Sequence, residues 1–404
     1  MQKVIFLVDM NAFFISCEAT RHPEIINKPA AVAGDPKNRA GIILTANYEA
    51  RKFGVKTTML LHQALKLCPD MAIIPPDHQF YKQKSREVMS ILSQYTPSIE
   101  QNSIDEAWLD MTGCEGIFGK PFESAKRIMK HINHELDLKC SIGISQNKFL
   151  SKMASDMKKP SGITELWRQD IKVKLWPLPI ESMYGVGRQT AQKLQRMGIK
   201  TIGDLALFSR QHLIKKLGKI GAEIHQLANG IDISPIKPHF KKDIKSISKS
   251  TTLGEDISDM ERAKIILMKL SDEVGMTARK YEKKGHTIQI SIKYSNFQTI
   301  TRQTTVPATY LVKEIYSTGI KLLEKNWDLQ LPIRLLGISL SGFSGDTSIQ
   351  QISIFNMKKI KREESCMRSA DKVDKIENAI DSIRKKYGYS IINRAILMKK
   401  NNKD

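Results

Sequence analysis

The spacing of hydrophobic residues changes along the first 166 positions, and each spacing predicts a different element. "KVIFLVD" (3–9) is a continuous apolar run that ends at a carboxylate, which predicts a buried strand. "FESAKRIMKHINHEL" (122–136) repeats its apolar residues at helical spacing, and "KCSIGIS" (139–145) reads as another strand. Strands and helices that alternate in this way favour an α/β or α+β core built on one sheet.

A second module follows after residue 243, and its order is clearer. "HTIQISIK" (286–293) and "QTITRQTTV" (298–306) alternate strictly, which predicts strands with one buried face. A strand at "SISKSTTL", helices to about 283 and over 310–327, and a strand over 333–343 complete the series β-α-β-β-α-β, a ferredoxin-like module. A capping box formed by Ser258 and Glu261 is predicted to open the first helix. One late amphipathic helix carries Val373, Ile376, Ile380 and Ile383.

The region between the two modules, 167–232, is helical and punctuated by glycine. "YGVGRQTAQKL" (184–194) and "LGKIGAEIHQL" (217–227) are similar pieces. Backbone N–H groups at such turns bind phosphate without reading bases, so Gly185, Gly187 and Arg188 are candidate DNA contacts. A plain helical hairpin is the alternative. Lys293 lies on the polar face of its strand and is a further candidate, although an ordinary solvent face has the same pattern.

Charge and composition narrow the class of partner. Lys and Arg outnumber Asp and Glu by 64 to 42, giving a net charge of +22, so a polyanion such as nucleic acid or a membrane surface is expected. No stretch approaches the roughly 18 apolar residues of a membrane span, and the opening segment is too short for a signal peptide. The five cysteines form no C-x-x-C pair, which argues against a disulfide framework and a zinc site and fits a reducing cytosol. We therefore expect a cytoplasmic protein with no membrane partner.

Three carboxylates are candidates for a metal site. Asp9 ends the first strand, and Asp105 and Glu106 stand together in "NSIDEAWLDMTG" (102–113). Neighbouring strands would bring these like charges together, and hard divalent cations are the natural counter-charges. Simple alternation aims Asp105 and Glu106 at opposite faces, so this interpretation needs a bend in the chain. A solvent-exposed hairpin is the alternative.

Basic residues elsewhere suit a triphosphate. In "ANYEARKFGV" (46–55), Tyr48 and Arg51 are three residues apart and would share a helical face. A guanidinium binds phosphate bidentately. Lys159 precedes a proline and is predicted to lie in extended backbone. Taken singly, each of these residues is more often just an ordinary solvated side chain. No G-x-x-x-x-G-K-[ST] loop is present, so a Walker-type ATPase is excluded.

Taken in order, these segments resemble the Y-family (translesion) DNA polymerases, and most closely the polymerase IV or DinB-like branch. The resemblance runs from residue 3 to about 343 and rests on "VDMNAFFISCE", "YEARKFGVKTTM", "SIDEAWLD", "KFLSKMASDMKKPSG" and "GVGRQTAQKL". It implies an α+β, multidomain right hand. The expected parts are a ferredoxin-like palm (1–19 and 77–166), small fingers (20–76), a helical thumb with helix-hairpin-helix-like motifs (167–233), a basic linker (234–242), a βαββαβ little finger (243–343) and a tail (344–404).

The resemblance also assigns roles by position. Asp9, Asp105 and Glu106 would be catalytic and hold two Mg²⁺ ions, with Mn²⁺ as a substitute, and the Met10 carbonyl would be a backbone ligand. Phe14 would be the steric gate against a ribose 2′-hydroxyl, with Phe13 packed under the site. Tyr48, Arg51 and Lys159 would contact the triphosphate. Two positions depart from the family pattern: Asn11 stands where many relatives have aspartate, and Leu60 where they often have proline.

The tail contains "QISIF" (351–355), which is similar to the peptide that binds the bacterial sliding clamp (beta subunit). Gln351, Ile352, Ile354 and Phe355 would be its contacts, with isoleucine where the consensus has leucine. Such a peptide buries short apolar anchors in a groove. A short apolar strand would look the same.

The function implied is template-directed addition of dNTPs to a primer 3′-hydroxyl on primer–template DNA. The fingers are short and no segment is long enough for a proofreading exonuclease, so we expect low fidelity and translesion synthesis. We also expect a monomer that associates with the nucleoid when bound to DNA. The alternatives are a catalytically silent, clamp-tethered DNA-binding protein and a palm-type nucleotidyl cyclase. The three carboxylates disfavour the first, and the thumb and little finger are superfluous to the second.

Overall fold

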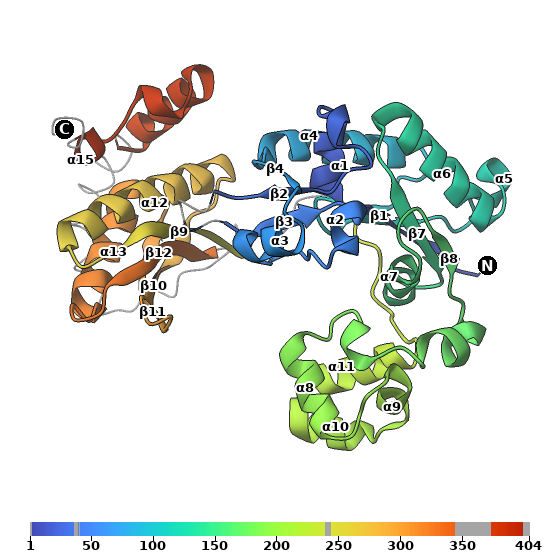
Figure 1. Ribbon diagram of the computed structural model, residues 1–404. Helices are drawn as coiled ribbons and strands as arrows, with labels where there is room; N and C mark the ends of the chain where they lie inside the picture. Colours follow the sequence, from blue (N-terminus) through green and yellow to red (C-terminus); the bar gives the residue numbers. More distant parts are fainter. Residues whose placement is uncertain (1, 36–38, 40, 239–243, 344–372, 399–404) are drawn as a thin grey trace. The chain divides into compact units, whose positions relative to one another are not determined.

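The computed structural model describes residues 2–35, 39, 41–238, 244–343 and 373–398 (Figure 1). Apart from Arg39, which groups with the C-terminal part, the chain divides into one compact unit up to residue 241 and a second from residue 242. In the described ranges the first unit contains two sheets and the second contains one, and each unit has its own hydrophobic core. In the described parts of both, no helix has the length and apolar character to cross a membrane.

The first unit is organised around a five-stranded sheet of order β5-β6-β1-β7-β8. Its strands are β1 (Ile5–Met10), β5 (Ile99–Gln101), β6 (Glu106–Asp110), β7 (Cys140–Ser145) and β8 (Ile163–Glu165). The central strand β1 is antiparallel to both β6 and β7, whereas β8 is parallel to β7. All six residues of β1 are buried, as the apolar run at 3–9 predicts. The catalytic candidates therefore start from the central, fully buried strand of the sheet.

The two faces of β1 have different neighbours. Val4, Phe6 and Val8 pack in a core with the buried faces of α4 (His78–Leu92) and α6 (Pro121–Leu136). Ile5 and Leu7 point the other way, where they cluster with Trp108. The Trp108 indole donates to the Lys148 carbonyl (3.1 Å), which places the start of α7 (Lys148–Met157) on this second face. Since side chains alternate along a strand, Asp9 shares the α7 face with Ile5 and Leu7.

A smaller sheet of order β3-β2-β4 lies between α1 (Phe13–Ala19) and α4 in the sequence. Its elements are β2 (Ala30–Ala33), β3 (Ile43–Ala46), β4 (Ala72–Ile74), α2 (Tyr48–Lys52) and α3 (Leu61–Leu67). The Asn47 side chain accepts from the Ala50 N–H (3.0 Å) and so caps α2 at its first turn. This cap fixes the start of α2 immediately after β3, and with it the positions of Tyr48 and Arg51 on the helix.

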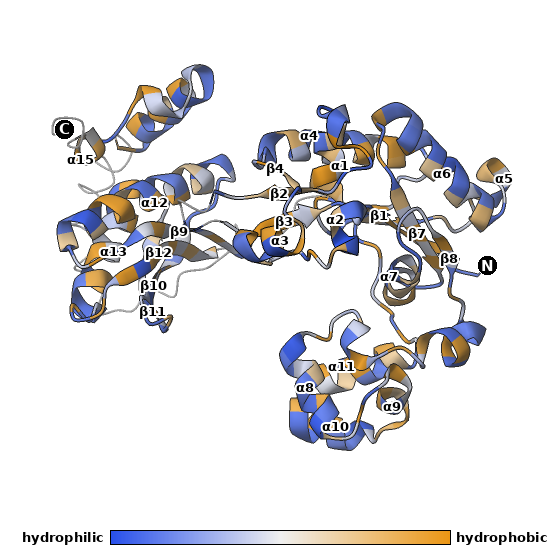
Figure 2. Cartoon of the chain, viewed as in Figure 1, coloured by the Kyte–Doolittle hydropathy of each residue, from blue (hydrophilic) through white to orange (hydrophobic). Residues whose placement is uncertain are grey.

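Residues 188–228, which follow the five-stranded sheet in the sequence, form four α-helices: α8 (Arg188–Arg196), α9 (Ile202–Leu207), α10 (Arg210–Leu217) and α11 (Lys219–Ala228). Helices α8 and α11 each begin directly after a glycine, Gly187 and Gly218, as the two similar sequence pieces predict. Gly185 (φ 88°) has the left-handed conformation that favours glycine. Figure 2 shows hydrophobic and hydrophilic residues mixed along these helices, as expected of elements that bury one face.

The second unit contains the predicted β-α-β-β-α-β series. Its elements are β9 (Ser246–Ile257), α12 (Met260–Lys280), β10 (Gly285–Tyr294), β11 (Thr299–Thr309), α13 (Val312–Asn326) and β12 (Ile333–Phe343). The strands form one antiparallel sheet of order β11-β10-β12-β9. The predicted start of α12 is wrong by one residue. Asp259, not Ser258, caps the helix, because its carboxylate accepts from the N–H groups of Glu261 (3.0 Å) and Arg262 (3.2 Å).

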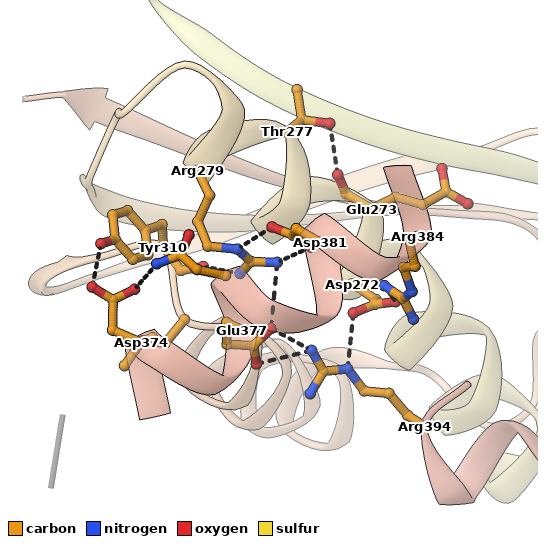
Figure 3. Close-up of polar contacts among 12 residues, drawn as sticks. Asp272, Glu273, Thr277, Arg279, Tyr310, Asp374, Glu377, Asp381, Arg384 and Arg394 are labelled. Carbon is orange, nitrogen blue, oxygen red and sulfur yellow. Dashed lines mark hydrogen bonds and ion pairs between the residues drawn. The ribbon is translucent and has the colours of Figure 1, made fainter. Parts of the chain in front are cut away.

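The last described segment forms a helix over 373–387, a 3-10 turn (Tyr389–Ile391) and α15 (Ala395–Met398). The helix is amphipathic as predicted, but its polar side is the buried one. Glu377 and Arg384 are buried, whereas Ile376 is 54% exposed and Tyr387 is 62% exposed. Figure 3 shows how acidic and basic side chains of this segment meet those of α12. The segment is therefore attached to α12 through charged contacts rather than through an apolar seam.

Candidate active site

The pairing of β1 with β6 creates the centre of the site. In the antiparallel register, Asp9 lies opposite Glu106. Asp105 precedes β6 in a bend, and its carbonyl accepts from the Met10 N–H (2.9 Å). The bend removes the objection that alternation separates Asp105 from Glu106, because Asp105 is not part of the strand. The solvent-exposed hairpin is disfavoured, since Glu106 pairs with the buried strand β1 and its side chain is only 16% exposed.

A cavity of about 280 Å³ opens at this point. It brings together nearly all the candidates that the sequence nominates for metal and triphosphate binding. The lining consists of Asp9, Met10, Asn11, Ala12, Phe13, Leu44, Thr45, Tyr48, Arg51, Thr57, Asp105, Glu106 and Lys159. Residues from β1, β3, α2, the start of β6 and the turn after α7 thus converge on one hollow. Phe14 is the one nominated residue that does not line it.

Two lysines hold the carboxylates of the site. Lys152, on α7, places its Nζ 2.9 Å from Asp9 Oδ2 and 2.5 Å from Glu106 Oε1. Lys159 Nζ lies 2.7 Å from the same Asp9 oxygen and 2.8 Å from Asp156 Oδ1. Lys159 lies in a turn, and its peptide bond to Pro160 is cis. The turn brings its ammonium group to the nominated site.

The two paired carboxyl groups have pKa values shifted in opposite directions. Burial alone would raise the pKa of Asp9, but its hydrogen bond with Glu106 and the charges of Lys152 and Lys159 outweigh burial and lower it. Burial and the neighbouring Asp9 raise the pKa of Glu106 despite its contact with Lys152. Asp9 is therefore the carboxyl group of the pair that ionises more readily. Ionisation of Glu106 is opposed by burial and by the negative charge of Asp9.

The donor set fits hard divalent cations, which prefer carboxylate and carbonyl oxygens. Within the described ranges, however, no three His, Cys, Asp or Glu side chains are arranged to hold a metal ion. The cation between Asp9 and Glu106 is the Lys152 ammonium group. The four carboxylates Asp9, Asp105, Glu106 and Asp156 outnumber the three cationic side chains Lys152, Lys159 and Arg51, so the site has excess negative charge for cations to neutralise.

Tyr48 and Arg51 lie on the same side of α2, as their spacing predicts. The Arg51 guanidinium carbon is 4.9 Å from the centre of the Tyr48 ring, and Arg51 Nε donates to the Ala46 carbonyl (2.9 Å). Burial raises the pKa of Tyr48 although Arg51 and Lys159 oppose the shift. Tyr48 therefore remains a neutral phenol that can donate to an anion, beside a guanidinium whose position is fixed through Nε.

The adjacent phenylalanines have different surroundings. Phe13 is buried and lines the cavity. The Phe14 ring stacks on Tyr81, with centroids 4.3 Å apart and planes 14° from parallel. Tyr81 is itself fixed by its hydroxyl, which donates to Glu18 Oε1 (2.6 Å). Stacking on Tyr81 thus fixes the ring of Phe14, which follows the cavity-lining Phe13 in the sequence.

Sequence reasoning missed Asn11 as a structural part of the site. Its amide donates to Ser141 Oγ (3.0 Å), and its oxygen accepts from the Ser161 N–H (2.8 Å). Asn11 therefore ties the end of β1 to β7 and to the turn that carries Lys159. Lys152 and Asp156 were missed as well. Their four-residue spacing marked them as a helical pair, but nothing in the sequence pointed Lys152 at Asp9, 143 positions away.

The candidate DNA contacts are not among the residues that line this cavity. Gly185, Gly187 and Arg188 are exposed at the start of α8. In the second unit, Lys293 Nζ lies 4.9 Å from the centre of the exposed Phe297 ring, and Arg334 lies 4.7 Å from it. Ile288, Ile290 and Ile292 are buried, so Lys293 and its alternating neighbours occupy the opposite face of β10. The clamp-peptide residues 351–355 lie outside the described ranges.

Comparisons with known proteins identify the family. Residues 8–156 match the impB/mucB/samB family, residues 244–354 match the C-terminal domain of that family, and residues 181–232 match the thumb domain of DNA polymerase-iota. A protein named DNA polymerase IV from Clostridium kluyveri is 73% identical over 99% of both chains. The chain belongs to the Y family of DNA polymerases, in the polymerase IV branch.

More distant relatives and a solved structure agree. DNA polymerase IV of Alkaliphilus oremlandii is 55% identical over 98% of this chain and 100% of that protein. DNA polymerase IV 1 of Bacillus subtilis is 38% identical over 98% of this chain and 94% of that protein. A Y-family DNA polymerase chimera of known structure has a TM-score of 0.76 at 25% identity, covering 84% of this chain and 99% of that one. The predicted multidomain α+β polymerase fold is confirmed.

This membership settles the general activity. The protein is a DNA-directed DNA polymerase of the translesion class, it binds primer–template DNA, and it requires a divalent metal. The silent DNA-binding alternative is not favoured.

Proposed function

We propose that this Y-family polymerase performs nucleotidyl transfer with two Mg²⁺ ions, or Mn²⁺ as a substitute, held by Asp9, Asp105, Glu106 and the Met10 carbonyl. The observation that carries this proposal is the convergence of Asp9, Asp105 and Glu106 with Tyr48, Arg51 and Lys159 on one cavity. When bound, the ions supply charge neutralisation and a lowered pKa of the primer 3′-hydroxyl. Side chains of this chain bind and orient the triphosphate.

The triphosphate is bound by groups already oriented toward the cavity. Arg51 offers its terminal guanidinium nitrogens, because Nε is engaged with the Ala46 carbonyl. Tyr48 donates as a neutral phenol, and Lys159 supplies a point charge. Such charge-assisted hydrogen bonds are short and about twice as strong as neutral ones. Their convergence orients the α-phosphorus and neutralises charge that develops in the transition state.

Primer extension with all four dNTPs tests the metal-binding assignment. Asp105→Ala is expected to reduce Mg²⁺-dependent extension at least ~10³-fold, in line with the cost of removing a group that stabilises transition-state charge. Asp110→Asn, at the far end of β6, is the matched control and should extend normally. Unchanged extension by Asp105→Ala would remove Asp105 from the site, whereas normal DNA binding by the inactive variant would exclude misfolding.

Phe14 is proposed as the steric gate and Phe13 as support beneath the base pair. Stacking on Tyr81 holds the Phe14 ring in place, as a gate that rejects a 2′-hydroxyl requires. Phe14→Ala should raise the ratio of ribonucleotide to deoxyribonucleotide incorporation by about 10-fold or more, because the site would lose the ring that excludes the extra oxygen. Tyr81→Phe is the control that keeps the stack. An unchanged ratio in Phe14→Ala would contradict the gate.

The remaining assignments follow the family layout. We propose a palm at 1–19 and 77–166, fingers at 20–76, a thumb at 167–233 and a little finger at 243–343. Gly185, Gly187, Arg188 and Lys293 are proposed backbone contacts to DNA, so affinity should fall steeply with salt and depend little on sequence. Short fingers and the lack of a proofreading segment in the sequence support low fidelity.

A clamp contact through Gln351, Ile352, Ile354 and Phe355 is also proposed, for a monomeric enzyme that works at the nucleoid. Deleting 351–355 should shorten extension products only when the clamp is present. An equal loss without the clamp would contradict the tether.

A further inference from the structure

Lys152 occupies the position between the two paired carboxylates. It reaches them from α7, which covers the Asp9 face of the sheet, and its side chain is only 10% exposed. Its Nζ contacts Asp9 Oδ2 at 2.9 Å and Glu106 Oε1 at 2.5 Å. A cation bound by the same two oxygens would face a positive charge within a few ångströms. The ammonium group and a metal ion are therefore competitors for this pair.

The two carboxylates that Lys152 contacts have further partners. Asp9 Oδ2 also accepts from Lys159 (2.7 Å), and the other Glu106 oxygen, Oε2, accepts from the Asn102 amide (3.0 Å). The pair is thus stabilised by this chain's own donors. Without those donors, two ionised carboxylates facing each other in a buried register would repel each other.

A second anion lies within reach of Lys152. Asp156, one turn further along α7, places Oδ2 3.3 Å from Lys152 Nζ. Its side chain is 45% exposed, so it is better solvated than Asp9 or Glu106. Lysine is a compact charge on a flexible stem of four carbons, and rotation of that stem moves the ammonium group without moving the helix. Lys152 can leave the carboxylate pair and remain paired on its own helix.

We propose that Lys152 is a displaceable counter-ion of the active site. It neutralises Asp9 and Glu106 in the metal-free enzyme, and it moves onto Asp156 when a divalent cation binds. It is a positioning residue, and it sets the affinity of the free enzyme for metal. The inference rests on the proposed assignment of Asp9 and Glu106 as metal ligands.

The test is Mn²⁺ binding to the full-length protein without DNA or nucleotide, followed by electron paramagnetic resonance of the unbound ion. Lys152→Met removes the competing charge at similar length and should tighten Mn²⁺ binding about 10-fold, because a positive charge a few ångströms away strongly repels the ion at a partly buried site. Lys152→Arg should weaken binding several-fold, since a guanidinium fork holds carboxylates bidentately. Asp156→Asn should also weaken it, since Lys152 would lose its alternative partner.

Lys148→Met is the matched control. Lys148 lies on the same helix and is similarly buried, but it pairs with Glu100 at 3.0 Å instead of with the site. Its removal should leave Mn²⁺ affinity within about twofold of wild type, because the charge of Lys148 is neutralised by Glu100 and does not occupy the carboxylate pair. Thermal unfolding with and without Mn²⁺ supplies a second readout. Lys152→Met should have a lower midpoint without metal and a larger rise on metal addition than wild type.

The outcomes distinguish the counter-ion role from the metal ligands themselves. Wild-type binding that is lost in Asp9→Asn, together with unchanged or weaker binding in a folded Lys152→Met, would overturn the counter-ion role and leave the metal site intact. Equal Mn²⁺ binding by wild type and Asp9→Asn would instead overturn the proposed metal ligands. If Lys152→Met does not fold, the weakening expected in Lys152→Arg and Asp156→Asn decides the question, and unchanged affinity in both would overturn the proposal.

Discussion

Each unit of this polymerase buries a cluster of opposite charges, and the two clusters are built differently. In the first unit, Lys152 and Lys159 form ion pairs with Asp9 and the carboxylates around it. In the second unit, the ion pairs join three arginines, Arg279, Arg384 and Arg394, to Asp272, Glu377 and Asp381 (Figure 3). The first cluster has more carboxylates than cations, whereas the second pairs three arginines with three carboxylates.

The choice of cation explains the difference. Arg394 contacts Asp272 Oδ1 at 2.8 Å and both oxygens of Glu377 at 2.8 and 2.6 Å. Such forks are geometrically fixed, and Asp272 is 0% exposed. The lysines of the first cluster are point charges that another cation can replace. A charge-balanced arginine cluster therefore joins elements permanently, while a lysine cluster with excess negative charge leaves a site for a ligand cation.

The largest expected effect comes from breaking the arginine cluster. Asp272→Asn leaves Arg384 buried without its charge partner and removes one of the two carboxylates that Arg394 contacts, which should lower the free energy of unfolding by about 3–5 kcal/mol. Glu255→Gln is the control, because its ion pair with Arg262 is exposed and worth at most about 1 kcal/mol. Urea unfolding of the full chain measures both. A loss in Asp272→Asn no larger than in the control would mean that the cluster does not hold the C-terminal segment.

A smaller effect is expected when the guanidinium group of Arg384 is replaced by an ammonium group, which keeps the positive charge. The Arg384 guanidinium pairs with Asp272 (2.7 Å) and donates to the Ile392 carbonyl from Nε and Nη2 (3.1 and 2.8 Å). Arg384→Lys keeps the charge but cannot make all three contacts, so it should cost about 2 kcal/mol. Arg262→Lys, at an exposed pair, should cost less than about 0.5 kcal/mol. Equal costs measured by urea unfolding would mean that charge, not geometry, stabilises the cluster.

The smallest expected effect is a difference between the two clusters in how their contribution to the free energy of unfolding changes with pH. Burial raises the pKa of Asp272, but the Tyr389 hydrogen bond and the charges of Arg394 and Arg384 outweigh burial and lower it. A lowered folded-state pKa stabilises the protein above the ordinary aspartate pKa, near ~3.9, and this stability is lost as the pH falls through the folded value.

Urea midpoints between about pH 2.5 and 6 should accordingly fall more steeply on acidification in wild type than in Asp272→Asn. Glu106 has a raised pKa, so its contribution has the opposite sign and weakens the fold as pH rises above its ordinary value. Parallel acid slopes for wild type and Asp272→Asn would contradict the assigned shift of Asp272.

The sequence predicted elements better than it predicted contacts. The buried run at 3–9, the alternation at 286–293 and the β-α-β-β-α-β order are all found in the structure. These features repeat over neighbouring residues, so local periodicity suffices to recognise them. Asp259 replaced Ser258 as the helix cap because both are good capping residues, and only the backbone geometry selects between them.

The C-terminal helix is the clearest limit of periodicity. Its spacing correctly indicates an amphipathic helix, yet its charged side is buried and Ile376 and Tyr387 are exposed. Burial of that side depends on Asp272, which pairs with Arg384, and on Arg279, which lies 102 positions before its partner Asp381. A pattern of apolar residues does not reveal whether a distant segment offers charges of the right sign.

By itself, the sequence determined the elements, the family and the candidate residues Asp9, Asp105, Glu106, Tyr48, Arg51 and Lys159, because each depends on local spacing or on motifs in order. Only the tertiary structure decided that Asp9 faces Glu106 across β1 and β6, that a bend frees Asp105 from the strand, and that Lys152 sits between the paired carboxylates. The contact between Lys152 and Asp9 joins residues 143 positions apart. Its strength depends on burial and charge balance, which exist only once the chain has folded.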